Sequence, residues 1–428
     1  MGFLTRKHDS RQYGIKAKLA LIALLASTLP ACDPGEPGLR GTIYIYLGLT
    51  EDQALSEQIV ASKRERAEFF LDAFQREHPG VGIQLQYYPE AELADRLRSK
   101  NLGGQGPDLL LINAGTVQLL HREALIRSIE PSQELLSQFR TSAIPPLRDG
   151  PSSLIGVPFV FEPQLACFNK KLLKRAPSDL KEMLETSDTR PGIGAPLTIS
   201  GLYWSLGSLG ARKAYHQLIL GQKLTQDSTE ALLHWLQWLQ DANTHAGMYF
   251  YTFPERLVAD FSGGKISWTP CRSPFIGEFE KELADDFGVA LLPQGPGGIA
   301  SPLSDMRVWA FGLDSSENQK KIARKLVEFA ANPLVQFRIS LDSDEVLPTN
   351  RRVVIPIQRS AFLHTLVAAH ENSPPLTKEI LEYQSDLELQ GAANKIMGKL
   401  LYGDLKPKKA LQKLEKLFRP ETKQASGR

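Results

Sequence analysis

Two polar side chains follow strand-like segments of this 428-residue sequence and could bind a ligand there. Asn113 comes directly after the apolar run 108–112, and Arg272 follows a strand-like segment that ends at Cys271. In open α/β sheets, ligands lie beyond the carboxyl ends of the strands. An amide donates and accepts hydrogen bonds, which suits a hydroxyl-bearing ligand, and a guanidinium can hold a carboxylate or phosphate. Asn113 could instead cap a helix, and Arg272 could form an ordinary salt bridge.

Aromatic side chains form a second set of candidates, because their rings pack against the apolar C–H faces of sugar rings. Tyr203 and Trp204 follow the small-residue turn 200–201, and Trp268 ends a strand-like segment. Trp309 lies in another apolar run. Each of these rings could also be a core residue, since large aromatic side chains are mostly buried.

Motifs of enzymes and metal centres are missing from the sequence. It has no His-Glu-x-x-His, Gly-x-Ser-x-Gly or Walker A pattern. Ser178 and Lys181 fit the letters Ser-x-x-Lys, but Ser178 follows a proline and is better explained as a helix cap. The eight histidines show no close metal-ligand spacing, and no cysteine pair has zinc spacing. We therefore expect a protein without enzymatic activity, cofactor or metal.

The start of the chain has the layout of an export signal. Basic residues precede the run LALIALLASTLPA, which is too short to span a bilayer because a spanning helix takes about 20 apolar residues. Segment 29–32 resembles a bacterial lipobox, so we expect a signal peptide of residues 1–31, lipidation of Cys32 and a tether over 32–41. Pro30 departs from that motif, and secretory cleavage nearby with Cys32 unmodified is the alternative.

The composition is that of a globular protein, with 42% hydrophobic and 23% charged residues. Five of the 50 Lys and Arg but one of the 48 Asp and Glu lie in the predicted signal peptide, so the remainder is slightly acidic. It has no basic excess that would favour nucleic acid. No second apolar stretch reaches membrane-spanning length, and the length beyond Cys32 suits two domains.

Strand-like and helix-like segments alternate along the chain, which predicts a doubly wound α/β fold. Residues 42–49, 81–88 and 108–112 are predicted strands of a first series, and a second series begins near Ile155. The remaining predicted strands are 164–169, 287–292 and 308–313, and the main predicted helices are 55–77, 91–102, 117–124, 228–243, 317–331 and most of 377–418.

Two cysteines remain beyond Cys32. In an exported protein Cys167 and Cys271 could form one disulfide, but the sequence alone does not bring them together. Cys167 lies in an apolar segment and could also be a buried free thiol. Both possibilities stay open at this point.

Several short segments occur in an order that is typical of one family. FLDAFQREHPGVGIQLQ (70–86), GQGPDLLLINAG (104–115) and GVPFVFEPQLACFNKKLL (156–173) come first. FSGGKISWT (261–269), FGVALLPQGPGG (287–298), VEFAANPLVQ (327–336) and VLPTNRRV (346–353) follow. This order resembles the family 1 extracellular solute-binding proteins of ABC importers, the maltose-binding-protein type, over most of the chain.

The resemblance implies two doubly wound lobes joined by hinge strands, the type II periplasmic-binding-protein fold. It also implies roles for two residues. In sugar binders of the family, a carboxylate at the position of Glu162 contacts ligand hydroxyls, and Phe275 lies where many members carry a ligand-facing aromatic ring. The loop at Asn113 lacks the Asp and Arg of maltose binders, so their sugar contacts there cannot be transferred. The expected lobe boundaries are 42–157 and 297–346 for the first lobe, 158–296 and the helices of 347–420 for the second, and 421–428 for a disordered tail.

We therefore expect a lipoprotein that captures a carbohydrate or sugar derivative by hinge closure and delivers it to the transmembrane subunits of an ABC permease. It would be a monomer, anchored by its lipid to the outer face of the cytoplasmic membrane, on the periplasmic side in a Gram-negative cell. A rival hypothesis keeps the fold and has it bind a polyamine, a metal complex or an organophosphate. The protein could also be a ligand sensor or an exported carbohydrate-active enzyme, which would need a second carboxylate besides Glu162.

Overall fold

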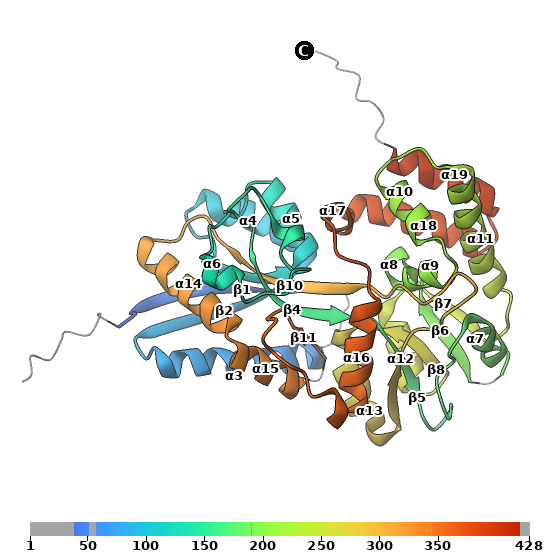
Figure 1. The fold of residues 1–428 in the computed structure, drawn as a ribbon, viewed down its shortest axis with the longest axis horizontal. Helices are drawn as coiled ribbons and strands as arrows, with labels where there is room; N and C mark the ends of the chain where they lie inside the picture. Colours follow the sequence, from blue (N-terminus) through green and yellow to red (C-terminus); the bar gives the residue numbers. More distant parts are fainter. Residues whose placement is uncertain (1–37, 51–56, 190, 344, 420–428) are drawn as a thin grey trace, which may run out of the picture. The chain divides into compact units, whose positions relative to one another are not determined.

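Two β-sheets with helices around them organise the described part of the chain (Figure 1). The computed structural model describes residues 38–50, 57–189, 191–343 and 345–419. The predicted signal peptide, Cys32, most of the tether and the tail 421–428 lie outside these residues. All the strands and helices described below belong to one unit, Arg40–Arg428.

The first sheet contains β1 (Gly41–Leu49), β2 (Val81–Pro89), β3 (Leu109–Asn113), β4 (Val157–Pro163), β10 (Ser304–Phe311) and β11 (Leu347–Pro348). Its strand order is β11-β4-β10-β3-β1-β2. β1 is parallel to β2 and β3, whereas β10 runs antiparallel between β3 and β4. The continuous apolar run of β3 fits this position, because helices cover both faces of such a sheet.

The helices that accompany the first sheet define, together with it, what we call the first lobe. Packing of α14 against β1 and β4, of α3 against β2 and of α5 against β3 buries the apolar sides of the strands. The predicted helix 317–331 coincides with α14, whose first turn has a capping box between Ser316 and Gln319. These helices are α3 (Glu57–Glu77), α4 (Leu93–Leu102), α5 (Ala114–Arg122), α6 (Gln133–Leu136), α14 (Glu317–Ala331) and α15 (Pro333–Ser343), with short 3-10 turns η1 (Glu90–Glu92) and η2 (Pro145–Leu147).

The second sheet contains β5 (Leu165–Asn169), β6 (Gly192–Pro196), β7 (Met248–Tyr251), β8 (Ile266–Cys271) and β9 (Phe287–Ala290). Its order is β7-β6-β8-β5-β9, with β6 parallel to β7 and β8, and β5 antiparallel to β8 and β9. With it the second lobe includes α7 (Leu180–Ser187), α8 (Ile199–Leu202), α9 (Trp204–Ser208), α10 (Arg212–Ile219), α11 (Gln226–Ala242), α12 (Pro254–Ser262), α13 (Ser273–Leu283) and the 3-10 turn η3 (Ala284–Asp286).

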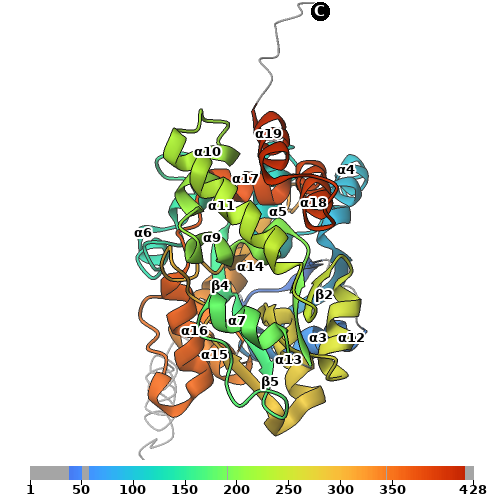
Figure 2. The ribbon, with the colours of Figure 1, turned by 90° about the vertical axis from the view of Figure 1, so that its right-hand side faces the viewer.

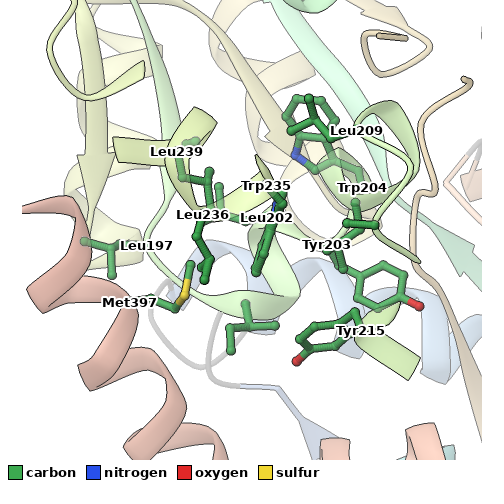
Figure 3. Close-up of a cluster of buried hydrophobic side chains, with 14 of the residues drawn as sticks. Leu197, Leu202, Tyr203, Trp204, Leu209, Tyr215, Trp235, Leu236, Leu239 and Met397 are labelled. Atoms are coloured by element: carbon green, nitrogen blue, oxygen red, sulfur yellow. The ribbon is translucent and has the colours of Figure 1, made fainter. Parts of the chain in front are cut away.

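The core of the second lobe forms around the amphipathic helix α11 (Figure 3). Trp235, Leu236 and Leu239 of this helix are fully buried, at the spacing of one helix face. Trp235 packs edge to face with Tyr215 and donates a hydrogen bond from Nε1 to Ser205 Oγ at 2.9 Å. The indole is thereby buried without leaving its polar atom unpaired.

The chain passes from the first sheet to the second through one residue, Gln164, between β4 and β5, and it returns to the first sheet over 291–303, between β9 and β10. The predicted lobe boundary at 157/158 therefore lies before the point where the chain changes sheet. The two strands β4 and β5 follow each other almost without a break, so the sequence does not mark where the first ends and the second begins. Likewise, β11 (Leu347–Pro348) pairs with β4 in the first sheet, although residues from 347 onward were expected in the second lobe. We call β4 and β10 the hinge strands.

Four helices close the chain: α16 (Ala361–Asn372), preceded by the 3-10 turn η4 (Ile357–Arg359), then α17 (Lys378–Ser385), α18 (Leu387–Leu401) and α19 (Pro407–Phe418). α18 and α19 pack on α11 of the second lobe (Figure 2), whereas α17 packs on α5 of the first. α16 contacts β4 as well as β5 and β9, so it touches both sheets. Among the described residues we find no helix with the length and apolarity that a bilayer crossing requires.

Cys167 on β5 and Cys271 on β8 form a disulfide, with their Cα atoms 5.7 Å apart. The two strands are antiparallel neighbours in the second sheet, which places the two cysteines at bonding distance. The bond resolves the question left open by the sequence and closes a loop with a sequence separation of 104 residues.

Candidate functional site

A cavity of about 280 Å³ is lined by residues of both lobes. The first lobe contributes Glu90, which follows β2, and Asn113 and Thr116, which lie at and just beyond the end of β3; the crossing residue Gln164 also lines the cavity. The carboxyl ends of parallel strands thus border the cavity, as in other open α/β sheets. From the second lobe and the C-terminal helices come Pro196, Thr198, Gly201, Tyr251, Arg272, Phe275, Gln384, Gln390 and Asn394. We call it the interlobe cavity.

Asn113 is held at the cavity by a buried ionic network. Its side chain makes no hydrogen bond to cap α5; instead Oδ1 accepts a hydrogen bond from Arg307 Nη1 at 2.9 Å. The same guanidinium nitrogen lies 2.5 Å from Glu90 Oε1, and Nη2 donates to the carbonyl oxygens of Gly48 and Leu111, each at 2.7 Å. Glu90 also accepts hydrogen bonds from the backbone N–H of Asn113 and from the Thr116 hydroxyl. The network fixes the junction between the end of β3 and the start of α5.

Arg272 lies at the start of α13 in the second lobe and lines the cavity. Its Nη1 is 3.1 Å from Asp305 Oδ2 on the hinge strand β10. Burial raises the pKa of the Asp305 carboxyl; the positive charge of Arg272 lowers this pKa, and the nearby charge of Glu162 raises it. Asp305 stands opposite Glu162 in the β10–β4 register. The ion pair therefore joins the second lobe to the hinge.

The charges at the interlobe cavity are thus paired within the protein. Two of the described residues that line it are charged, Glu90 and Arg272, and their counter-charges are Arg307 and Asp305. A charged ligand would have to compete with these internal partners and would leave a buried charge uncompensated. The arrangement suits an uncharged ligand.

Amide side chains supply much of the cavity's hydrogen-bonding capacity. Gln164 is 2% exposed; its Nε2 donates to the Gly201 carbonyl at 3.3 Å, and its Oε1 has no hydrogen-bond partner in the described part of the chain. Asn394 on α18 accepts a hydrogen bond from the backbone N–H of Ile199 at 2.9 Å through Oδ1. Gln384 and Gln390 add two more amides. Sequence reasoning missed these four residues, which carry no motif.

Most of the predicted aromatic candidates belong to the core. Trp204, Trp268 and Trp309 are at most 2% exposed and do not line the interlobe cavity. Trp204 packs edge to face against Trp268, and Tyr203 packs in the same way against Tyr215. Burial rather than ligand contact accounts for these rings in the structure.

Phe275, the aromatic ring indicated by the resemblance, does line the cavity, and Tyr251 at the end of β7 is the second aromatic residue there. The Tyr251 hydroxyl donates a hydrogen bond to Asp260 Oδ2 at 2.9 Å, which fixes the ring. Burial and this carboxylate raise the pKa of Tyr251. The described cavity therefore has two rings that could pack on an apolar ligand face.

Glu162 lines a separate recess of about 150 Å³ in the first lobe rather than the interlobe cavity. Trp309, Arg307 and Glu345 border the same recess, and Glu162 is 7% exposed. The structure thus brings Asn113, Arg272 and Phe275 together at one cavity and places Glu162 with Trp309 at another. In the described part of the chain, no group of three or more His, Cys, Asp or Glu side chains is arranged to hold a metal ion.

Comparison with known proteins identifies the class to which this fold and cavity belong. Residues 70–358 match the family described as bacterial extracellular solute-binding protein. The match covers more than half of the chain, so the chain belongs to this family of exported binding proteins, and the resemblance seen in its motifs is confirmed.

Individual relatives agree with that assignment. The chain is 22% identical to the maltodextrin-binding protein MdxE of Bacillus subtilis over 353 residues, which cover 76% of this chain and 80% of the relative. Its fold matches the GacH receptor of Streptomyces glaucescens, known unliganded and with acarbose, with a TM-score of 0.72, 16% identity, and coverage of 89% of this chain and 98% of the receptor.

A solute-binding protein of Thermotoga lettingae bound to α-D-tagatose gives a TM-score of 0.68 at 16% identity, covering 88% of this chain and 98% of that one. The predicted α/β class with two doubly wound lobes is therefore confirmed.

Proposed function

We propose that this protein captures an uncharged carbohydrate or sugar derivative in the interlobe cavity and delivers it to an ABC permease. The observation that carries the proposal is the pairing of both charged lining residues, Glu90 with Arg307 and Arg272 with Asp305. What remains for a ligand is a lining of amides, hydroxyls and two aromatic rings. Hydroxyl groups of a sugar both donate to and accept from such side chains.

The cavity's dimensions support a short sugar. Its volume of about 280 Å³ is slightly below the roughly 300–1,000 Å³ of pockets for drug-sized molecules. Phe275 and Tyr251 are the candidates for packing against the apolar face of a sugar ring. Asn113 and Gln164 are the candidates for hydrogen bonds to its hydroxyls. These assignments favour a mono- or disaccharide.

The relatives support the carbohydrate class. MdxE is a maltodextrin-binding protein, the GacH receptor is known with acarbose, and the Thermotoga lettingae protein is bound to α-D-tagatose. These ligands range from a monosaccharide to an oligosaccharide, so the likeness favours carbohydrate while the cavity of this chain favours a short one.

Closure of the two lobes would supply the coupling to transport. Because residues of both lobes line the cavity, a ligand contacts all of them only when the lobes are shut, and it therefore stabilises the shut form. The chain crosses between sheets at Gln164, within the cavity wall, so the crossing is a natural place for the hinge. The shut form would dock on the transmembrane subunits of the permease.

We further propose that the mature protein is a monomeric lipoprotein, anchored through Cys32 to the outer face of the cytoplasmic membrane. The support is the sequence alone: basic residues, a short apolar run and a lipobox-like segment ending at Cys32. Acylation would keep the binding protein beside its permease.

The rival ligand classes receive less support. A polyamine or an organophosphate would require an unpaired cavity charge of opposite sign, whereas Glu90 and Arg272 are paired. A glycosidase needs two carboxylates across its substrate. Glu162 and Asp305 face each other across β4 and β10, but Asp305 is paired with Arg272 and neither lines the interlobe cavity. We therefore propose binding without turnover.

The test is calorimetric titration of the purified protein, stripped of co-purified ligand, with a panel of neutral mono- and disaccharides, sugar phosphates, uronates and polyamines. We expect saturable binding of at least one neutral sugar and none of the charged compounds at matched ionic strength. Saturable binding confined to a phosphorylated sugar or a polyamine would overturn the proposal, as would release of a cleaved product from the bound sugar.

A further inference from the structure

A second cavity, of about 490 Å³, is lined by residues of the hinge strands β4 and β10 and of the helix α16. It is lined by Phe161 of β4 and Ser304 of β10, together with Arg140, Arg351 and Glu371. Its volume falls within the range of small-molecule sites, about 300–1,000 Å³. We call it the hinge cavity.

Adjacent residues of β10 relate to the two cavities in different ways. Ser304 lines the hinge cavity, whereas the next residue, Asp305, pairs with Arg272, which lines the interlobe cavity. Successive side chains of a strand point to opposite faces. The two cavities therefore both lie next to the hinge strands, but their lining residues differ.

A short antiparallel backbone pairing places two arginines on one face. Phe139 and Asn350 are bridge partners; Arg140 N–H donates to the Thr349 carbonyl, and Arg351 N–H donates to the Gln138 carbonyl, each at 2.8 Å. Arg140 and Arg351 are then diagonal neighbours, a relationship that puts side-chain roots about 7–8 Å apart on the same face. Phe139 and Asn350, on the other face, are buried.

Neither guanidinium has a carboxylate partner in the described part of the chain. Arg140 donates a hydrogen bond from Nε to the Pro348 carbonyl at 3.2 Å, which orients the group and leaves its two Nη atoms for another acceptor. Burial lowers the pKa of Arg140, and the negative charge of Glu371 opposes this effect. Two arginines thus line the cavity, and Glu371 is the one carboxylate among its described lining residues.

We infer that the hinge cavity is a binding site for a small oxyanion, a phosphate- or carboxylate-bearing molecule held between Arg140 and Arg351. Guanidinium groups bind such oxygens through paired N–H donors. Arg140 is half-buried, where its charge is screened less than in water, and Arg351 is exposed. The hydroxyls of Thr141 and Ser142, which also line the cavity, supply further donors. At the interlobe cavity each charged lining residue has an ion-pair partner, whereas Arg140 and Arg351 have none among the described residues. This difference also favours an anionic ligand for the hinge cavity.

The position of the site would couple it to lobe closure. Ser304 Oγ lies 2.8 Å from His370 Nδ1 on α16, and α16 contacts strands of both sheets. An anion between the first-lobe arginines and this helix would favour one setting of the hinge over another. By linkage, the anion and the interlobe ligand would then change each other's affinity by one common factor.

The test is calorimetric titration of the whole protein with inorganic phosphate and, separately, with citrate, at constant ionic strength set by sodium chloride. We expect saturable binding of at least one of them, and which one binds decides between the phosphate and the carboxylate form of the ligand. Arg140→Gln and Arg351→Gln should each weaken it roughly tenfold or more. Arg352→Gln is the matched control, since Arg352 is an adjacent exposed arginine that does not line the cavity.

Glu371→Gln provides a readout that a structural role of the arginines would not produce. Removing the one carboxylate of the cavity should tighten anion binding several-fold, the opposite direction from the arginine variants. The inference is overturned if neither anion binds saturably to the folded wild-type protein, or if Arg140→Gln and Arg352→Gln bind equally well. These titrations measure anion binding at the hinge cavity and do not depend on which solute binds in the interlobe cavity. Their outcome therefore tests this inference separately from the proposed function.

Discussion

Arg272 of the second lobe and Asp305 of the hinge strand β10 form an ion pair across 3.1 Å at the edge of the interlobe cavity. Glu162 stands opposite Asp305 in the register of the two hinge strands, so a second negative charge lies close to the paired carboxylate. The pair links the start of α13 in the second lobe to a strand of the first sheet. It is therefore placed to affect ligand affinity and stability together.

Arg272→Gln should lower affinity for the neutral sugar about tenfold and destabilise the protein by about 2 kcal/mol, because it leaves a buried carboxylate without its partner. The loss of Arg272 also removes an interaction that lowers the pKa of Asp305, so this pKa rises further above its unfolded value. A group with a raised folded pKa binds more protons in the native state, so the variant's stability should fall as the pH increases through that pKa.

Denaturant unfolding of the Arg272 variant between pH 4 and pH 8 measures this slope. Adding Asp305→Asn should abolish it, since the titrating carboxyl is gone. Arg175→Gln, which removes an exposed arginine paired with Glu182, is the control and should show neither effect. If the free energy of unfolding of the Arg272→Gln variant depended on pH as in the wild-type protein, Arg272 would not be the residue that lowers the pKa of Asp305.

Arg307→Met should destabilise the protein by about 3–5 kcal/mol, because both side chains of the Arg307–Glu90 pair are 8% exposed and Glu90 would be left buried without a counter-charge. Chemical denaturation gives the stability of the variant. The double variant Glu90→Gln/Arg307→Met should recover part of the loss, since the uncompensated charge is removed with it. Equal stabilities of the single and double variants would contradict the explanation that the unpaired Glu90 charge causes the loss.

Gln164→Met should weaken sugar binding roughly tenfold, since the amide lines the cavity and its Oε1 has no partner in the described part of the protein. Calorimetric titration measures the change. Gln118→Met is the matched control: Gln118 is also buried and also donates to one backbone carbonyl, that of Pro146, but it does not line the cavity. If both variants lose affinity equally, Gln164 has no specific role in binding.

His370 should make the protein sensitive to acid. Burial lowers the pKa of His370 to about 4, and Arg140 adds to the effect, whereas the unfolded imidazole titrates near 6.5. The unfolded state therefore binds the additional proton between these values, and stability is lost as the pH falls from 6.5 to 4, by up to about 3 kcal/mol.

Thermal or urea unfolding of His370→Gln over the same pH range should show a flatter profile than the wild-type protein. His364→Gln, at an exposed position of the same helix, serves as the comparison and should leave the profile unchanged. A profile of His370→Gln that parallels the wild type would rule out this histidine as the source.

The order of elements was predictable because it depends on local patterns. Helix α14 matches its prediction to the residue, since Ser316, Gln319 and Asn332 mark its ends in the sequence. Helix α5 starts three residues before the predicted 117, directly at the end of β3, because no spacer separates strand from helix. Local signals place elements well and their ends less well.

The site was predictable only in part because it is assembled from distant segments. Arg307 reaches Glu90 across 217 positions, and Gln164 lines one cavity with amides of the C-terminal helices, relationships that no spacing encodes. Trp204, Trp268 and Trp309 have the ring chemistry of sugar contacts, but burial decides whether a ring meets ligand or core. Asn113 and Phe275 line the interlobe cavity, and they could be named as candidates because a strand end and a family pattern mark their positions.

The bond between Cys167 and Cys271 has a consequence for how the protein must be produced. Closing so long a loop restricts the unfolded chain and stabilises the native state by roughly 4 kcal/mol. The disulfide, and with it this stabilisation, forms only where thiols are oxidised; in a reducing cytosol the two cysteines stay as free thiols. Recombinant protein made in a reducing cytosol would carry two free thiols, one on β5 and one on β8 directly before Arg272, and its measured affinities would describe a less stable molecule than the exported one.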